Sequence, residues 1–292
     1  MLLREFLVER YAPLRSLSDR SVTIFSQTID RVEGFLGRPA VLEDLTDLTI
    51  AKFLRWRAQQ PHRGRLPSAA TVAKDRAHLG ALATLAAKKR LIAEFVELPR
   101  VRVPLRPPRG YTVEEVSALI RAAGRKIGHI GPVPAPWFWR TLVWAAWCTG
   151  ERIGALLHVR WDDVDLDRQS IVLLGEHRKD HATTIERAIT AELAAAMRPQ
   201  ARPTGLVWPW LEHRTANSIF ASMKALCVAA KVQPRGFHAI RKASGSYVQA
   251  AGGDASAHLG HRNPKTTRDH YLDPRITGQQ SGLDYLPPLD LE

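Results

Sequence analysis

The sequence has only two cysteines in 292 residues, Cys148 and Cys227. Neither belongs to a CxxC pair or to a cysteine and histidine cluster with zinc-site spacing, so the pattern excludes a zinc-finger class. Both cysteines lie in segments that read as buried helix. We expect two reduced core residues, as in a cytoplasmic protein.

Long apolar segments are also missing. The longest run, residues 137–148, contains Arg140 and is too short to span a bilayer. Arg4 and Glu5 place charge within the first five residues, which argues against a signal peptide. We therefore expect a cytoplasmic location and no membrane partner.

Acidic residues are few compared with basic ones. Asp and Glu number 29 and Lys and Arg number 42, which gives a formal net charge of +13. A basic excess of this size favours a polyanionic partner, and nucleic acid is the commonest one. Charge alone leaves this interpretation about even with a solvated basic surface that has no special partner.

The first 98 residues have the pattern of a helical domain. Apolar side chains recur at helical spacing, and Ser18 or Ser21, Thr46 and Ser68 are suited to cap three successive helices. Basic residues in the loop 61–67 and along the neighbouring helices either solvate the surface or contact DNA phosphates. We favour phosphate contacts, which position a protein without reading sequence, by Arg55, Arg57, Arg63, Arg65, Lys74, Arg76 and His78.

Residues 99–110, PRVRVPLRPPRG, read as a basic linker. Proline disfavours both helix and central strand, so a stretch this rich in proline is extended and semi-rigid. The candidate DNA contacts in this segment are Arg102, Arg106 and Arg109.

Residues 111–275 read as a second domain. Thr112 and Glu115 form a capping box at its start, and residues 137–147 are apolar on nearly every face, as in a buried central helix. Short strands are predicted over residues 161–165, 170–174 and 183–189.

Two short motifs in this domain carry side chains suited to phosphodiester chemistry. The first is Thr149-Gly150-Glu151-Arg152, followed by LLHVRWDDVD. The second is His238 and Arg241, one helical turn apart, followed by Leu259-Gly260-His261 and by Tyr271. An arginine binds phosphate oxygens through two N–H groups, a histidine can move a proton near neutral pH, and an activated tyrosine hydroxyl is a nucleophile.

These motifs, in this order, resemble the signature of the tyrosine recombinases, the phage integrase family. The resemblance covers residues 110–275 well and the first hundred residues loosely. It implies a mainly α fold with a small antiparallel β-sheet, in which a helical, SAM-like core-binding domain and a catalytic domain close around DNA. The domains expected are residues 1–98, the linker 99–110, the catalytic domain 111–275 and a C-terminal tail, 276–292.

The resemblance also implies roles for six residues and no cofactor or metal. Tyr271 would attack the phosphorus, and Arg152 and Arg241 would hold its non-bridging oxygens. His238 would help to take the tyrosine proton, and His261 would add a hydrogen bond to the phosphate. Lys179, in the turn between the second and third strands, would protonate the leaving 5′ oxygen, although Arg178 or His177 could occupy that place. The product would be a 3′-phosphotyrosyl link.

Two departures from the family pattern stand out. The family commonly has an acid three residues after the first arginine, to brace the active-site side chains, and this chain has Ala155 there. Glu151 is adjacent to Arg152, and we expect it to point elsewhere on a helix. The interval from His261 to Tyr271 is ten residues, one more than in many members; Tyr285, in the tail, is a rival nucleophile.

We therefore predict a site-specific DNA recombinase or integrase that acts on double-stranded recombination sites. It would be a homotetramer on DNA and a monomer or weak oligomer without it, in the cytoplasm and associated with the nucleoid. The alternatives are a DNA-binding relative that has lost catalysis, suggested by Ala155, and a topoisomerase of type IB chemistry that relaxes DNA. The sequence names neither the target site nor the mobile element served.

Overall fold

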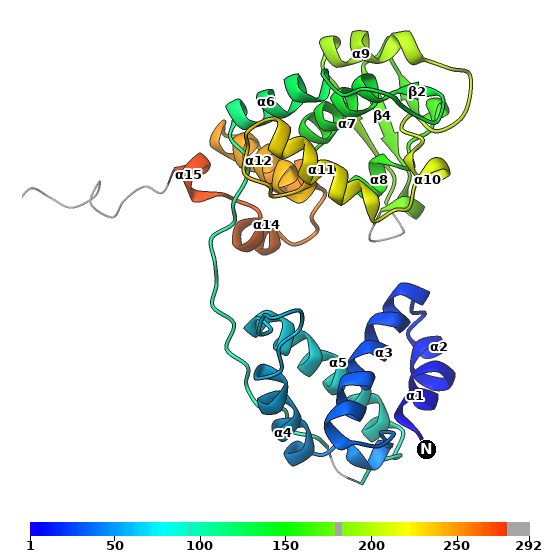
Figure 1. The fold of residues 1–292 in the computed structure, drawn as a ribbon, viewed down its shortest axis with the longest axis vertical. Coiled ribbons are helices and arrows are strands. Elements are labelled where there is room, and N and C mark those ends of the chain that lie inside the picture. The colour runs from blue at the N-terminus through cyan, green and yellow to red at the C-terminus, as the bar shows by residue number, and fades with distance from the viewer. Residues whose placement is uncertain (94, 179–182, 279–292) are drawn as a thin grey trace, which may run out of the picture. The chain divides into compact units, whose positions relative to one another are not determined.

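The structure is a computed structural model that describes residues 1–93, 95–178 and 183–278. The chain divides into two compact units, Met1–Arg106 and Pro107–Glu292 (Figure 1). No helix in the described part of the chain is long and apolar enough to cross a membrane. The sequence-based expectations for Lys179 and for the tail beyond Gly278 fall outside the described residues.

The first unit is helical throughout. Its elements are α1 (Leu3–Glu5), the π-helix η1 (Phe6–Tyr11), α2 (Ala12–Leu14), α3 (Asp19–Leu36), the 3-10 helix η2 (Leu42–Asp44), α4 (Asp47–Ala58) and α5 (Ala69–Lys88). The side chains of Ser18, Thr46 and Ser68 cap α3, α4 and α5, as predicted, with Ser18 rather than Ser21 capping α3. Each accepts a hydrogen bond from a backbone N–H in the first helical turn.

A buried carboxylate holds these helices together. Asp75 of α5 is 2% exposed and accepts hydrogen bonds from Arg57 of α4, Arg31 of α3 and Thr28 of α3. His78 bonds Thr28 and stacks on Phe25, a residue of α3. Arg57 is 8% exposed and therefore stabilises the interior, so placing it on the DNA-facing surface was wrong, whereas His78 is half-buried between α3 and α5.

Arg76 is likewise engaged within the first unit. Its guanidinium donates to the carbonyl oxygens of Pro99 (2.6 Å) and Leu98 (3.4 Å). It thus holds the start of the linker segment against α5. A helical pattern places a side chain on a face, but not against a segment that returns from elsewhere in the chain.

The second unit surrounds the apolar helix α7 with helices and a small sheet (Figure 1). Its first half contains α6 (Val113–Ala123), β1 (His129–Ile130), β2 (Val133–Pro134), α7 (Ala135–Thr149), α8 (Ile153–Leu156), η3 (Trp161–Asp163), β3 (Val164–Asp165), β4 (Ser170–Leu173), η4 (Gly175–His177) and β5 (Ile185–Ala188). Its second half contains α9 (Ala191–Met197), η5 (Arg198–Gln200), α10 (Trp210–His213), α11 (Ser218–Ala229), α12 (Phe237–Ala250), α13 (Ala255–Leu259), α14 (Pro264–His270) and α15 (Pro274–Thr277).

The sheet is antiparallel, in the order β3-β4-β5, and Ile171 pairs with Arg187 across its two longer strands. The mainly helical fold with a small antiparallel sheet is confirmed. The first predicted strand is shorter than expected, because residues 161–163 form the 3-10 helix η3 and only Val164–Asp165 pair with β4. A short hairpin of β1 and β2 lies between α6 and α7.

Candidate active site

The first arginine motif begins where α7 ends. Gly150 has φ +62° and caps the C-terminus of α7, so the chain turns sharply before Glu151 and Arg152. A Cβ at Gly150 would lie 2.7 Å from His258 Nε2, which adds a packing reason for glycine. Arg152 is the N-cap residue of α8 and is partly buried. The turn therefore brings both side chains toward the end of α7 rather than along a helix.

Arg241 of α12 joins three segments of the site. It is 1% exposed, and its guanidinium donates to the carbonyl oxygens of Gly150 (2.5 Å) and Leu259 (2.6 Å). The same Nη2 lies 3.0 Å from His261 Nε2. Its Nε has no acceptor among the described residues. Arg241 therefore locks the ends of α7 and α13 against α12.

Tyr271 follows α14 and lies against the same residues. Its ring centroid is 4.4 Å from that of His261 and 5.0 Å from that of His238, in edge-on contacts. The Arg241 guanidinium carbon is 5.5 Å from the centroid of Tyr271. Arg152, His238 and Arg241 line one cavity of about 450 Å³. The structure thus gathers five of the six predicted site residues, and the sixth, Lys179, lies outside the described part.

The electrostatics of this cluster favour neutral imidazoles. Burial, and then the charges of Lys242, Arg241 and Arg152, lower the pKa of His238 to about 4. Burial and the two arginines lower the pKa of His261 to about 4 as well. Burial also lowers the pKa of Arg241 to about 10, which leaves it cationic at neutral pH. A neutral His238 beside Tyr271 can accept a proton, as a general base must.

A third histidine in this region, His258, has the same shift. Its ring bonds the Ser244 hydroxyl at 2.7 Å, and burial, Arg187 and Arg241 lower its pKa to about 4 despite the opposing charge of Glu151. An imidazole whose pKa falls on folding stabilises the protein fully above its unfolded pKa, near 6.5, and loses that contribution as the pH falls toward 4.

We therefore expect the free energy of unfolding to fall less between pH 7 and pH 5 in the variant His258→Gln than in wild type. The expected difference, after allowance for solvent screening, is about 1 kcal/mol. Urea unfolding of wild type and variant at both pH values measures it. An equal loss in the two proteins would contradict the folded-state pKa of His258.

Glu151 is the residue of the site that sequence analysis placed wrongly. Its side chain is 1% exposed, and its carboxylate accepts hydrogen bonds from Arg178 Nη2 and from the Arg152 N–H, both at 3.2 Å. It also lies 3.6 Å from Arg241 Nη1. Because it follows the left-handed Gly150 and precedes α8, Glu151 is not on a helix and faces inward. The available signal was that Glu151 is the only acid between residues 116 and 161.

His177 and Arg178, the alternatives to Lys179, both line the cavity beside Arg152, and Glu151 holds Arg178 there. Arg178 is 4% exposed and donates to Glu151 and to the Thr183 carbonyl oxygen, the latter at 2.7 Å. It therefore ties the two ends of the segment 179–182 together and ties both to Glu151. A basic residue next to a turn carries no sequence signal for such a contact, which depends on a partner 27 positions away.

Besides Arg55, the exposed residues among the predicted DNA contacts are Arg63, Arg65, Lys74, Arg102, Arg106 and Arg109. Arg63 and Arg65 lie in one tight turn closed by backbone hydrogen bonds between His62 and Arg65. Lys74 lines a cavity of about 300 Å³ with Arg31 and His78. The other three lie along the extended linker segment.

Known proteins resemble this chain in sequence and in fold. The chain is 25% identical over 185 residues to a putative tyrosine recombinase XerC of Pseudomonas aeruginosa, a match that covers 60% of this chain and 42% of that protein. The chain thus spans less than half the length of this relative.

Solved structures share the fold at low sequence identity. One is the Tn1549 transposon integrase in complex with a circular intermediate DNA, with a TM-score of 0.72 and 13% identity over 98% of this chain and all of that one. Another is a lambda integrase tetramer bound to a Holliday junction, with a TM-score of 0.66 and 16% identity over all of this chain and 81% of that one.

The family model that matches is that of the phage integrase family, over residues 112–276. That range is more than half of the chain, and it contains α12, the Leu259-Gly260-His261 motif and Tyr271. The chain belongs to the phage integrase family.

Proposed function

We propose that the chain is a site-specific DNA recombinase that cleaves and rejoins DNA strands through a 3′-phosphotyrosyl intermediate. The observation that carries the proposal is the gathering of Tyr271 with Arg241, His238 and His261 beside one cavity. These groups supply a nucleophile, a cation and proton acceptors within one site, which is what cleavage of a phosphodiester needs.

In the cleavage step, the Tyr271 hydroxyl oxygen attacks phosphorus and the bond from phosphorus to the 5′ oxygen breaks. His238 takes the tyrosine proton; its lowered pKa in the DNA-free protein means that the imidazole is neutral and has a free lone pair for this proton. Arg152 and Arg241 bind the non-bridging oxygens, where negative charge builds up. The phosphotyrosyl bond replaces the broken ester, so rejoining is the same step in reverse, with a 5′ hydroxyl as the attacking group.

His261 has a role that the hydrogen bonds refine. Arg241 can only donate, so His261 Nε2 accepts, and His261 Nδ1 then carries the proton and donates to Thr267 Oγ1 at 2.8 Å. This tautomer favours orientation of Arg241 as the first role of His261. A hydrogen bond from His261 to the phosphate would need Nε2 to be protonated.

Glu151 replaces the missing acid at position 155 in this proposal. It contacts the backbone of Arg152 and lies near the guanidinium of Arg241, so it can brace both arginines. Ala155 is itself buried beside the cavity, where a longer side chain would take space. The position of Glu151 argues against the inactive relative suggested by Ala155.

Lys179 is proposed as the donor of the leaving-group proton on the family motif alone. The position of Arg178, which precedes Lys179 in the chain, supports this role indirectly, because Arg178 lines the cavity and contacts Glu151. No cofactor or metal enters the proposed reaction.

The proposed partner is double-stranded DNA, with four copies of the chain on two duplexes. The Tn1549 and lambda integrases, which share the fold, were solved with DNA, and the latter as a tetramer. Strand exchange between two defined sites, measured against relaxation of a supercoiled plasmid, tests the proposal. Exchange is expected; relaxation without exchange would instead support the topoisomerase-like alternative.

Arg63 and Arg65 offer a test of the DNA-binding surface. Replacing both by alanine removes two candidate phosphate contacts, so affinity should fall for every DNA sequence, and the slope of log K against log salt should drop by about 1 to 2. Fluorescence anisotropy at several salt concentrations measures both quantities.

A matched control removes two arginines that carboxylates already hold. Arg4 bonds Asp30 and Glu33, and Arg38 bonds Asp44. The variant Arg4→Ala with Arg38→Ala should leave the salt slope unchanged. An equal drop in both variants would mean that only net charge matters.

A further inference from the structure

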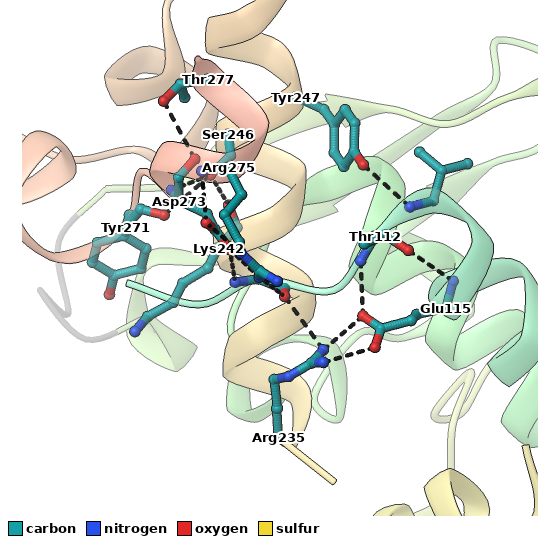
Figure 2. A network of polar contacts seen from close by, with 12 residues as sticks. Thr112, Glu115, Arg235, Lys242, Ser246, Tyr247, Tyr271, Asp273, Arg275 and Thr277 are labelled. Carbon is teal, nitrogen blue, oxygen red and sulfur yellow. Dashed lines mark hydrogen bonds and ion pairs between the residues drawn. The ribbon is translucent and has the colours of Figure 1, made fainter. Parts of the chain in front are cut away.

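Gly110, the last residue of the linker, forms hydrogen bonds with two segments: the one that follows Tyr271 and the one that precedes α12. The N–H of Gly110 donates to Asp273 Oδ2 at 2.8 Å, and its carbonyl oxygen accepts from Arg275 Nη2 and Arg235 Nη1, each at 3.3 Å. Figure 2 shows the side chains of Asp273, Arg275 and Arg235 in this network. The linker thus ends in a contact that uses both of its backbone polar groups.

Gly110 also lies directly on the backbone of α12. A Cβ at this position would be 2.9 Å from both Cα and N of Ala243, closer than a real side chain allows. Ala243 is two residues after Arg241. Only glycine permits the linker to approach the arginine-bearing helix this closely.

Asp273 connects this contact to the tyrosine. It is two residues after Tyr271 and 0% exposed, and its N–H donates to Ser246 Oγ at 2.8 Å. The Ser246 hydroxyl lies 2.7 Å from the Lys242 carbonyl oxygen and 3.2 Å from that of Tyr271. The backbone on both sides of Leu272 is therefore tied to α12, as Figure 2 shows.

The N–H groups of Tyr271 and Leu272 both donate to the Thr267 carbonyl oxygen, at 2.9 and 3.2 Å, so Tyr271 is held to α14 on its N-terminal side. It is the C-cap residue of α14, with φ −122° and ψ −33°, and residues 271–273 lie between α14 and α15. A residue outside a helix takes its position from the contacts of its neighbours. In the described structure, Asp273 and Ser246 provide those contacts on the C-terminal side.

Arg235, which binds the Gly110 carbonyl oxygen, is itself held in place by other contacts. Arg235 forms two hydrogen bonds with Glu115, both at 2.7 Å, and its guanidinium lies over the ring of Tyr111, 4.8 Å from the centroid. Glu115 in turn accepts from the Thr112 N–H at the start of α6. Gly110 is thus fixed between α6, α12 and the tyrosine segment, and displacing it would strain all three.

We propose that the contact between Gly110 and Asp273 couples the linker to the nucleophile, with Asp273 as a positioning residue for Tyr271. The linker continues along the chain to the first unit. A displacement of the linker would move Gly110, and its contact with Asp273 would then shift Tyr271, two residues away. A misplacement of about 1 Å at a reacting group can cost about 100-fold in rate. The inference rests on the proposed function, because it gives Tyr271 the role of nucleophile.

The test uses the full chain and compares two aspartates placed symmetrically about Tyr271. Asp273→Asn weakens the buried contact, whereas Asp269→Asn, two residues before Tyr271, removes only ion pairs with Lys265 and Arg268, which are both exposed. The rate of covalent attachment to nicked DNA is measured at saturating DNA, with Kd measured separately. Asp273→Asn should be about 10- to 100-fold slower with Kd changed less than about twofold, and Asp269→Asn should match wild type.

The linker side is tested by Gly110→Ala and by the double variant. If both residues act through one contact, the double variant should be no slower than the slower single variant. Multiplied effects, or Asp273→Asn as fast as Asp269→Asn, would overturn the coupling. Ser246→Ala, which removes only a hydroxyl, serves if Asp273→Asn melts at a much lower temperature; it should also slow attachment, and wild-type speed would overturn the inference.

The same experiment separates this inference from the proposed function. Covalent attachment by wild type with no loss in Asp273→Asn would leave the recombinase assignment standing and remove the coupling. No attachment by wild type, despite DNA binding, would overturn the proposed function itself.

Discussion

Tyr271→Phe is expected to abolish covalent attachment to DNA while DNA affinity stays within about twofold of wild type. The substitution removes the attacking oxygen and leaves the ring, so the contacts with His238, His261 and Arg241 remain. Loss of a catalytic nucleophile costs at least about 10⁴-fold in rate. The affected quantity is the amount of DNA that stays bound to protein after denaturation in SDS.

The measurement traps the protein on nicked DNA fragments, followed by denaturing electrophoresis and sequencing of the captured DNA. Tyr247→Phe is the matched control, because the Tyr247 hydroxyl accepts a hydrogen bond from the Val113 N–H and lies on the same helix as Arg241. It should still form the adduct. An adduct that persists in Tyr271→Phe and disappears in Tyr285→Phe would transfer the nucleophile to the tail.

Glu151→Gln is expected to cause the second largest loss. The carboxylate is the countercharge of Arg178 and lies near Arg241, and all three side chains are 4% exposed or less. Removing one partner of a buried ion pair leaves the other charges uncompensated and costs about 3 to 5 kcal/mol. Because Glu151 would no longer hold Arg178 and Arg241 in place, the rate of covalent attachment should fall on the order of 100-fold.

The measurements are urea unfolding and single-turnover attachment to nicked DNA. Glu186→Gln, on the exposed side of β5, is the control for loss of one negative charge and should resemble wild type. In the variant Glu151→Gln with Ala155→Glu, an acid stands at the position that the family pattern favours, and part of the rate should return. Wild-type activity in Glu151→Gln alone would show that the arginines need no carboxylate.

The helices and the chemistry of the site were largely readable from local sequence. Ser18, Thr46, Ser68 and Thr112 mark helix starts, since each cap depends on residues only three positions away. The spacing of His238 and Arg241 places both on one face of a helix for the same reason. The short strands were less well predicted, because a segment such as residues 161–165 is too short to show a period.

The sequence by itself therefore determined the family, the mainly helical fold and the residue types of the candidate site. Only the tertiary structure decided which charges face inward. Glu151 turns into the site because Gly150 ends α7 in a left-handed conformation. Arg57 is buried because it donates a hydrogen bond to Asp75 on another helix. Gly110 meets Asp273 across 163 positions. Local spacing encodes neighbours within a turn or two, whereas such contacts exist only once distant segments pack together.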